Sequence, residues 1–238
     1  MDDFDAALMK PAVTAERPLA GLTILVVEDS RYASEAMRLL CLRSGARIRR
    51  ADCLASARRH LQVYLPSVAI VDLGLPDGSG EDLIRELTGS GPRTGVVLGT
   101  SGDADGECAS IAAGADGFLM KPVETLAEFQ TAVLEQLPAE DRPVGASPSG
   151  TEHIHPDPIA FHDDLTHIST ILRSDADAGT VDYIAQFLSG VARSAHDTTL
   201  QAAADALARD CAKGRPIRSD LARLAGIVQD RLSLGRAI

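Results

Sequence analysis

The chain has 238 residues, and its 45% hydrophobic and 24% charged residues match the average of globular proteins. Disorder and collagen-like repeats are therefore excluded as descriptions of the whole chain. The formal net charge of -11 at pH 7 repels phosphate backbones and anionic membrane surfaces, so binding to either would require a local basic patch. Only 3% of the residues are aromatic, which argues against nucleic-acid binding by stacked rings.

The cysteines and the N-terminal segment bear on the cellular compartment. The four cysteines, at positions 41, 53, 108 and 211, lie too far apart for a CxxC pair and are expected to be reduced thiols. The first ten residues, MDDFDAALMK, are acidic where a secretion signal would be basic. The apolar runs are too short to span a bilayer. We therefore expect a cytoplasmic protein.

From Thr23 onward, short β-branched runs alternate with helical patterns, which is typical of a parallel sheet with helices on both faces. The expected strands lie at 24–27, around 48, and at 68–71, 96–98 and 118–120. The expected helices lie at about 32–44, 54–65, 81–88, 105–113 and 124–137. The second strand contains Arg47, Arg49 and Arg50, which suit an edge strand and not a covered one. We predict a doubly wound α/β domain with five parallel strands in the order 2-1-3-4-5.

The rest of the chain has a different pattern. Residues 138–158 hold five of the twelve prolines and show no apolar periodicity, which indicates a linker. From about residue 159, Ala, Leu and Ile recur at three- and four-residue spacing, which predicts a small all-α bundle of three or four helices. We therefore expect an α/β domain over 20–138, a Pro-rich linker over 139–158 and a helical bundle over 159–238.

Acidic side chains follow two of the predicted strands: Glu28 and Asp29 the first, and Asp72 the third. Because neighbouring parallel strands open onto the same crevice, these three carboxylates should converge. They would repel one another unless a hard divalent cation such as Mg²⁺ lay among them. Thr100 and Lys121 end the fourth and fifth strands and could bind an anion there. The simplest anion is a phosphoryl group carried by Asp72 as an acyl phosphate.

These motifs, including AIVDLGLPDGSG, GTSGD and GADGFLMKP, resemble the receiver domain of two-component response regulators over about residues 20–138. The resemblance implies that Asp72 is the phosphoacceptor and that Thr100 and Lys121 bind the phosphoryl oxygens. It also implies a Mg²⁺ site made by Glu28, Asp29, Asp72 and the backbone carbonyl of Gly74. Phe118 stands at the position of the aromatic residue that switches rotamer together with Thr100.

Within the helical part, the run Gln186-Phe187-Leu188-Ser189-Gly190 resembles the His-x-Leu-Lys-Gly motif of histidine phosphotransfer (Hpt) domains. Gln186 and Ser189 replace the His and the Lys, so the resemblance implies an Hpt-like bundle that has no imidazole to phosphorylate at this position. The pair His162-Asp163 more faintly resembles the phosphoacceptor box of histidine kinases, which leaves an internal relay through His162 open.

Taken together, these features predict a response regulator of a phosphorelay that takes a phosphoryl group from a histidine kinase or a histidine phosphotransfer protein. Such a protein is not a turnover enzyme, although the receiver catalyses its own phosphorylation and dephosphorylation. Its output would be protein–protein contacts of the receiver and the bundle with an unknown partner or a second copy of the chain.

Two alternatives stay open. In an Asp-nucleophile phosphohydrolase, a second acid usually follows the nucleophile by two residues, but position 74 is Gly. A DNA-binding transcriptional regulator could use Arg215, Arg218 and Arg223 near the C-terminus, but Asp220 and Asp230 interrupt that positive charge.

Overall fold

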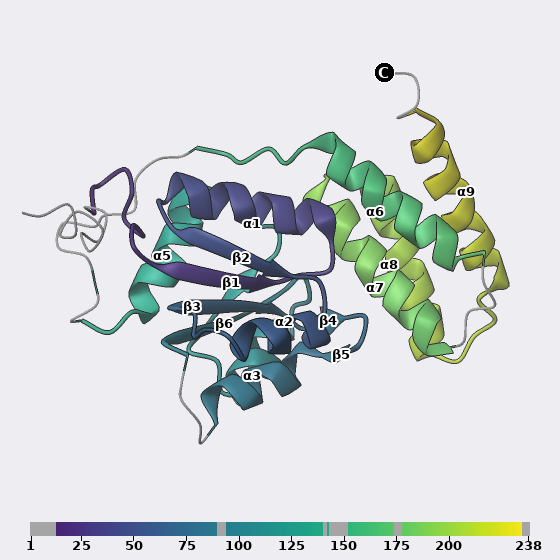
Figure 1. The fold of residues 1–238 in the computed structure, drawn as a ribbon. Coiled ribbons are helices and arrows are strands. Elements are labelled where there is room, and N and C mark those ends of the chain that lie inside the picture. The colour runs from purple at the N-terminus through teal and green to yellow at the C-terminus, as the bar shows by residue number, and fades with distance from the viewer. Residues whose placement is uncertain (1–12, 90–93, 140–141, 143–151, 174–177, 235–238) are drawn as a thin grey trace, which may run out of the picture.

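The computed structural model describes residues 13–89, 94–139, 142, 152–173 and 178–234 (Figure 1). Five parallel strands form the main sheet in the order β2-β1-β3-β6-β7. They are β1 (Thr23–Val27), β2 (Arg47–Ala51), β3 (Val68–Asp72), β6 (Val96–Ser101) and β7 (Gly117–Met120). A small antiparallel ladder of β4 (Gly74–Leu75) and β5 (Gly78–Ser79) follows β3. Counted without this ladder, the main sheet has the predicted order 2-1-3-4-5, so the predicted fold class is confirmed.

The predicted edge position of the Arg-rich strand is also confirmed. β2 ends the sheet and pairs in parallel with β1. The side chains of Arg47, Arg49 and Arg50 are exposed. An edge strand leaves charged side chains in water, where they cost no desolvation and discourage pairing with another sheet.

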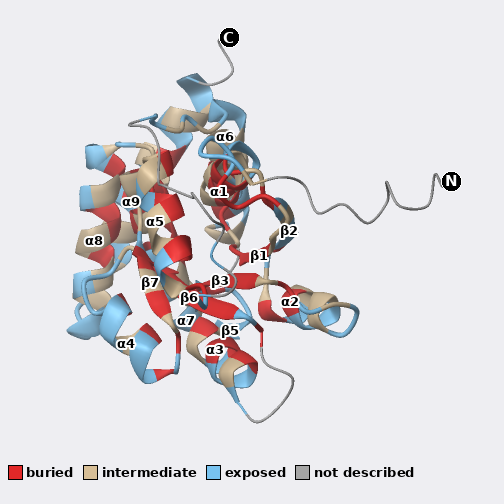
Figure 2. Ribbon diagram, turned by 90° about the vertical axis from the view of Figure 1, so that its left-hand side faces the viewer, coloured by how far each residue is buried: buried red, intermediate tan, exposed pale blue. Residues whose placement is uncertain are grey.

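Helices cover both faces of the sheet (Figure 2). Alternate residues of each central strand belong to the apolar cores on opposite sides of the sheet. These helices are α1 (Arg31–Arg43), α2 (Leu54–Leu61), α3 (Gly80–Thr88), α4 (Gly106–Ala112) and α5 (Leu126–Gln136). Ile24 and Val26 of β1 pack with the α1 and α5 side, and Leu25 and Val27 pack with the α2 and α3 side. α2 ends at Leu61 and not at 65, in keeping with Pro66, which disfavours helical backbone in the residue before it.

Four further helices form a bundle with its own apolar core. They are α6 (Pro158–Ile171), α7 (Ala178–Ser194), α8 (Thr198–Ala212) and α9 (Arg218–Leu234). α6 begins with Pro158 at its first turn, and the side chain of Asp157 caps it by accepting from the backbone N–H of Ile159. Ile168, Ile184 and Leu188 are fully buried between the helices.

The last residues of the predicted linker pack against the α/β domain. The backbone N–H of Leu126 donates to the backbone carbonyl oxygen of Glu152, and the backbone N–H of Ile154 donates to the backbone carbonyl oxygen of Glu124. Ile154 also packs against the core under α1 and α5. Residues 140, 141 and 143–151 of that linker lie outside the described residues. The attachment over 152–154 brings the start of α6 close to α1, so the bundle lies at the carboxyl ends of the strands (Figure 1).

Among the described residues, no helix combines the length and the apolar character that crossing a membrane requires.

Candidate functional site

Three carboxylates converge at the carboxyl end of the sheet, as the sequence predicts. Glu28 and Asp29 follow β1, Asp72 ends β3, and one oxygen from each lies within 4.8 Å of the others. The start of α3 lies close against the end of β3, at Gly80, the first residue of α3. A Cβ atom there would stand 1.9 Å from the carbonyl oxygen of Asp72, so only glycine lets α3 begin against the end of β3.

Lys121, just after β7, joins two of these carboxylates. Its Nζ lies 2.6 Å from Oε2 of Glu28 and 2.8 Å from Oδ2 of Asp72. Burial opposes the charge of the ammonium, but the attraction of Asp72 and Glu28 outweighs it, and the pKa of Lys121 is raised. The ammonium therefore stays protonated and holds a fixed positive charge beside Asp72.

Two of these carboxylates, Glu28 and Asp29, are destabilised as anions. Burial raises the pKa of Glu28 to about 8, against the lowering effect of Lys121, and Asp72 and Asp29 add to the rise. Burial likewise raises the pKa of Asp29 to about 7, with Asp72 adding its repulsion. A divalent cation among the three side chains would offset this repulsion, and carboxylate oxygens are the ligands that Mg²⁺ prefers. The donor set Glu28, Asp29 and Asp72 therefore fits Mg²⁺.

These pKa shifts predict how Mg²⁺ affinity depends on pH. Mg²⁺ binds the carboxylate anions, and protons with pKa values of about 8 on Glu28 and about 7 on Asp29 compete with it. We expect the affinity measured by isothermal titration calorimetry to rise from about pH 6 to about pH 8, by up to roughly tenfold per displaced proton and pH unit. Glu28→Gln should weaken binding and flatten the rise above pH 7. A pH-independent affinity would contradict this prediction.

Three other predicted residues lie around the three carboxylates with different contacts. Thr100 pairs with Asp72 in the register of β3 and β6, but its buried hydroxyl donates to the carbonyl oxygen of Leu119 at 2.7 Å. The backbone N–H of Gly74 donates to Oδ1 of Asp72 at 3.4 Å. Phe118 is partly buried beside the start of α4, where a Cβ on Gly106 would lie 3.1 Å from its Cζ. The switch role of Phe118 and Thr100 and the metal role of the Gly74 carbonyl stay predictions.

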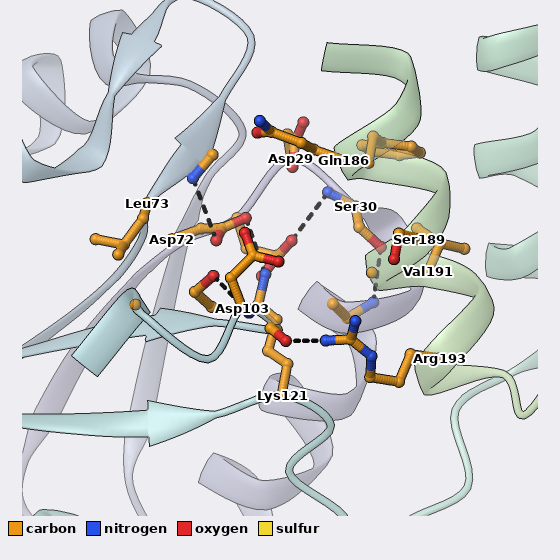
Figure 3. A pocket seen from close by; sticks show the side chains of 18 of the residues that line it. Asp29, Ser30, Asp72, Leu73, Asp103, Lys121, Gln186, Ser189, Val191 and Arg193 are labelled. Atoms are coloured by element: carbon orange, nitrogen blue, oxygen red, sulfur yellow. Dashed lines mark hydrogen bonds and ion pairs between the residues drawn. The ribbon is translucent and has the colours of Figure 1, made fainter. Parts of the chain in front are cut away.

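The bundle covers this site. Helix α7 supplies one wall of a cavity of about 270 Å³ whose other wall carries the three carboxylates and Lys121 (Figure 3). The hydroxyl of Tyr183 donates to Oδ2 of Asp29 at 2.7 Å. Further along α7, the guanidinium of Arg193 donates to the carbonyl oxygen of Gly102, in the loop after β6. Two loops of the α/β domain are therefore held by one helix of the bundle.

Helix α6 makes a second attachment through Asp164, which is only 2% exposed. Its carboxylate accepts from the hydroxyl of Ser30 at 2.8 Å and from the backbone N–H groups of Arg31 and Tyr32 at 2.8 and 3.1 Å. These N–H groups belong to the first turn of α1, where no residue of the helix itself can accept from them. Asp164 thus caps a helix of the other domain, directly after Glu28 and Asp29.

Sequence reasoning finds the residues at the strand ends and misses those of the bundle. Predicted strands are followed by Glu28, Asp29, Asp72 and Lys121. The bundle residues that the sequence does not predict are Asp164, Tyr183 and Arg193, which contact the loops after β1 and β6 of the α/β domain. No local pattern marks them. Gln186, identified only as a replacement for the His of the Hpt motif, lines the cavity opposite the carboxylates (Figure 3).

Comparison with known proteins identifies the class of the α/β domain. Residues 24–133 match the family model of the response regulator receiver domain. This segment is therefore a receiver domain of the two-component response regulators. The Hpt-like character expected of the bundle is not shown by this match and stays a prediction.

The chain is also similar to individual regulatory proteins. The transcriptional regulatory protein KdpE of Mycobacterium tuberculosis is 34% identical over 113 residues, which cover 46% of this chain and 50% of KdpE. The virulence transcriptional regulatory protein PhoP of Salmonella typhimurium is 32% identical over 113 residues, with the same coverage. The chain thus spans about half the length of the curated relatives it matches. A solved two-component response regulator from Clostridium difficile is 16% identical with a TM-score of 0.45, covering 50% of this chain and 98% of that chain.

Proposed function

We propose that this protein is a phosphorelay response regulator whose Asp72 accepts a phosphoryl group from a phosphohistidine of a partner kinase or phosphotransfer protein. The observation that carries the proposal is the placement of Asp72 between the acidic pair Glu28 and Asp29 and the ammonium of Lys121. The acidic pair, together with Asp72 and the carbonyl of Gly74, would hold Mg²⁺. When bound, that cation neutralises charge on the phosphoryl oxygens.

The residues of the chain itself account for the transfer. An oxygen of Asp72 attacks the phosphorus in line, the P–N bond of the phosphohistidine breaks, and its electron pair stays on the imidazole. Lys121 supplies a fixed positive charge 2.8 Å from Oδ2 of Asp72, where phosphoryl oxygens develop charge. Thr100 would turn from Leu119 toward the phosphoryl group, and Phe118 would move into the space it leaves.

The bundle is the output element of this proposal. A phosphoryl group adds about 1.5 to 2 negative charges inside the cavity that α7 closes. The Tyr183 contact uses an oxygen of Asp29, a proposed metal ligand, so α7 docking and the Mg²⁺ ion that phosphorylation would require act on the same side chain. We infer that phosphorylation weakens docking without abolishing it, so that the undocked fraction of the bundle can contact another protein or a second copy of the chain while the docked fraction still covers Asp72.

Hydrogen exchange tests this coupling. Adding Mg²⁺ and beryllofluoride, a mimic of the phosphoryl group, should lower protection in α7 and in the first turn of α1, because these segments meet only while the bundle is docked. Protection in α8 and α9, which lie away from the receiver, should stay unchanged and serves as the control. Unchanged protection in α7, with beryllofluoride bound, would contradict a role of docking in the output.

Transcriptional regulation is the second candidate because the curated relatives KdpE and PhoP are named transcriptional regulators. The shared segment is about half of each relative, and the residues from 150 onward carry 9 basic and 12 acidic side chains. This acidic balance favours a protein partner over DNA. Salt-dependent binding of the chain to random duplex DNA would favour the second candidate instead.

A further inference from the structure

Gln186 is an exposed residue of α7 that lines the cavity over the acceptor site. Its Nε2 donates to Oδ2 of Asp182, one turn earlier in α7, at 3.1 Å. Its Oε1 lies 3.7 Å from the position that a Cβ on Gly74 would occupy. Gly74 in turn donates its N–H to Asp72. With its amide nitrogen bonded to Asp182, Gln186 turns its carbonyl oxygen toward Gly74 of the receiver, in the cavity that Asp72 also lines (Figure 3).

An amide differs chemically from every other group around this cavity. Among the described residues that line it, Gln186 is the only one with a side-chain amide, while carboxylates, hydroxyls, Lys121 and Arg193 supply the other polar groups. An amide oxygen accepts a hydrogen bond from water without carrying a charge, so it does not repel a phosphoryl group as a carboxylate would. An amide also cannot be phosphorylated as an imidazole can.

The cavity between α7 and the receiver has room for water. Its volume of about 270 Å³ compares with about 30 Å³ per molecule in liquid water, and its lining is rich in polar groups. The docked bundle therefore covers part of the site, leaves it partly open to solvent and does not fill it. A wall that excluded water would protect a phosphoryl group, whereas this wall leaves space for water beside Asp72.

We propose that Gln186 positions the water molecule that hydrolyses the acyl phosphate on Asp72, so that the docked bundle resets the receiver of its own chain. The inference rests on the proposed function of Asp72. The water oxygen forms a bond to phosphorus, the bond between phosphorus and the Asp72 oxygen breaks, and the electron pair returns to the carboxylate. Both water protons leave with the phosphate as H₂PO₄⁻, so Gln186 accepts a hydrogen bond and takes up no proton.

The lifetime of the phosphorylated full-length chain tests this role. The chain is labelled with radioactive acetyl phosphate and Mg²⁺, the donor is removed, and loss of label is followed over time. Gln186→Met keeps the length of the side chain and removes the amide, and we expect it to slow the loss of label about tenfold. Gln229→Met, at an exposed position of α9 outside the cavity, should leave the rate unchanged.

Two further measurements separate the possible reasons for a changed rate. If Gln186 only shielded the site, the Met variant would lose its label as slowly as the wild type or faster, and either result would overturn the proposal. Hydrogen exchange should show equal protection of α7 in the variant and the wild type. A slow loss of label accompanied by lost protection would overturn water positioning in favour of undocking. Failure of both variants and the wild type to take up label would instead refute the proposed function.

Discussion

Replacing Asp72 with Ala should abolish phosphorylation of the chain. The wild type, incubated with Mg²⁺ and a small phosphodonor, should gain one phosphoryl group, because Asp72 ends the central strand β3 and has the ammonium of Lys121 2.8 Å from its Oδ2. Alanine removes the attacking oxygen, and neither Glu28 nor Asp29 ends β3 where Lys121 and the start of α3 surround the acceptor. Intact-mass spectrometry measures the added group directly.

The control for this experiment is Asp82→Asn, which removes one carboxylate from the exposed surface of α3. It should be phosphorylated to the same extent as the wild type. Excess EDTA should prevent phosphorylation of the wild type if Mg²⁺ acts at the three carboxylates. Full labelling of Asp72→Ala would place the acceptor elsewhere, with His162 the first residue to examine, since an acid-labile label there would indicate an internal relay.

Replacing Asp164 with Ala should release the bundle from the receiver. The change removes the acceptor of three hydrogen bonds from Ser30, Arg31 and Tyr32 and leaves two backbone N–H groups of the first turn of α1 without this partner. Hydrogen bonds to a charged group are worth about 1.5 to 3 kcal/mol, so docking should weaken by about 2 kcal/mol, or roughly 30-fold. Small-angle X-ray scattering should record a larger radius of gyration.

A neighbouring residue offers a matched control for this variant. Asp163 pairs with Arg31 on the surface, where the two side chains are 42% and 70% exposed. Exposed ion pairs contribute about 0 to 1 kcal/mol, so Asp163→Ala should leave the radius of gyration unchanged. Equal behaviour of the two variants would show that Asp164 does not hold the domains together.

Release of the bundle should change both the rate at which Asp72 gains a phosphoryl group and the rate at which it loses one. In Asp164→Ala, a phosphohistidine donor would no longer have to displace α7, so phosphorylation by a protein donor should be faster. The same variant should also keep its phosphoryl group longer, because Gln186 is moved away from Asp72. A faster gain and a slower loss in one variant would link the docked bundle to both steps.

The sequence alone determines the receiver domain because the patterns that predict it lie within short segments of the chain. Alternating apolar runs and helical patterns predict the parallel sheet, and the position of Glu28, Asp29 and Asp72 after two of those strands predicts their convergence. The geometry of a parallel sheet then brings strand ends together without any knowledge of distant contacts. The arginines of β2 predict its edge position for the same reason, since burial on both faces would leave their charges unpaired.

Only the tertiary structure decides where the bundle lies. Its helices are predicted from apolar spacing, but a helix pattern specifies which face is buried and not which domain it meets. No sequence pattern marks Asp164 or Tyr183, and the Hpt-like run marks Gln186 only as a replacement for a His. Each of the three has its partners more than 100 residues away. The docking contacts include polar ones such as those of Asp164 and Tyr183 and the edge-to-face packing of Tyr32 on Phe161, and hydrophobic periodicity within one helix does not specify these partners.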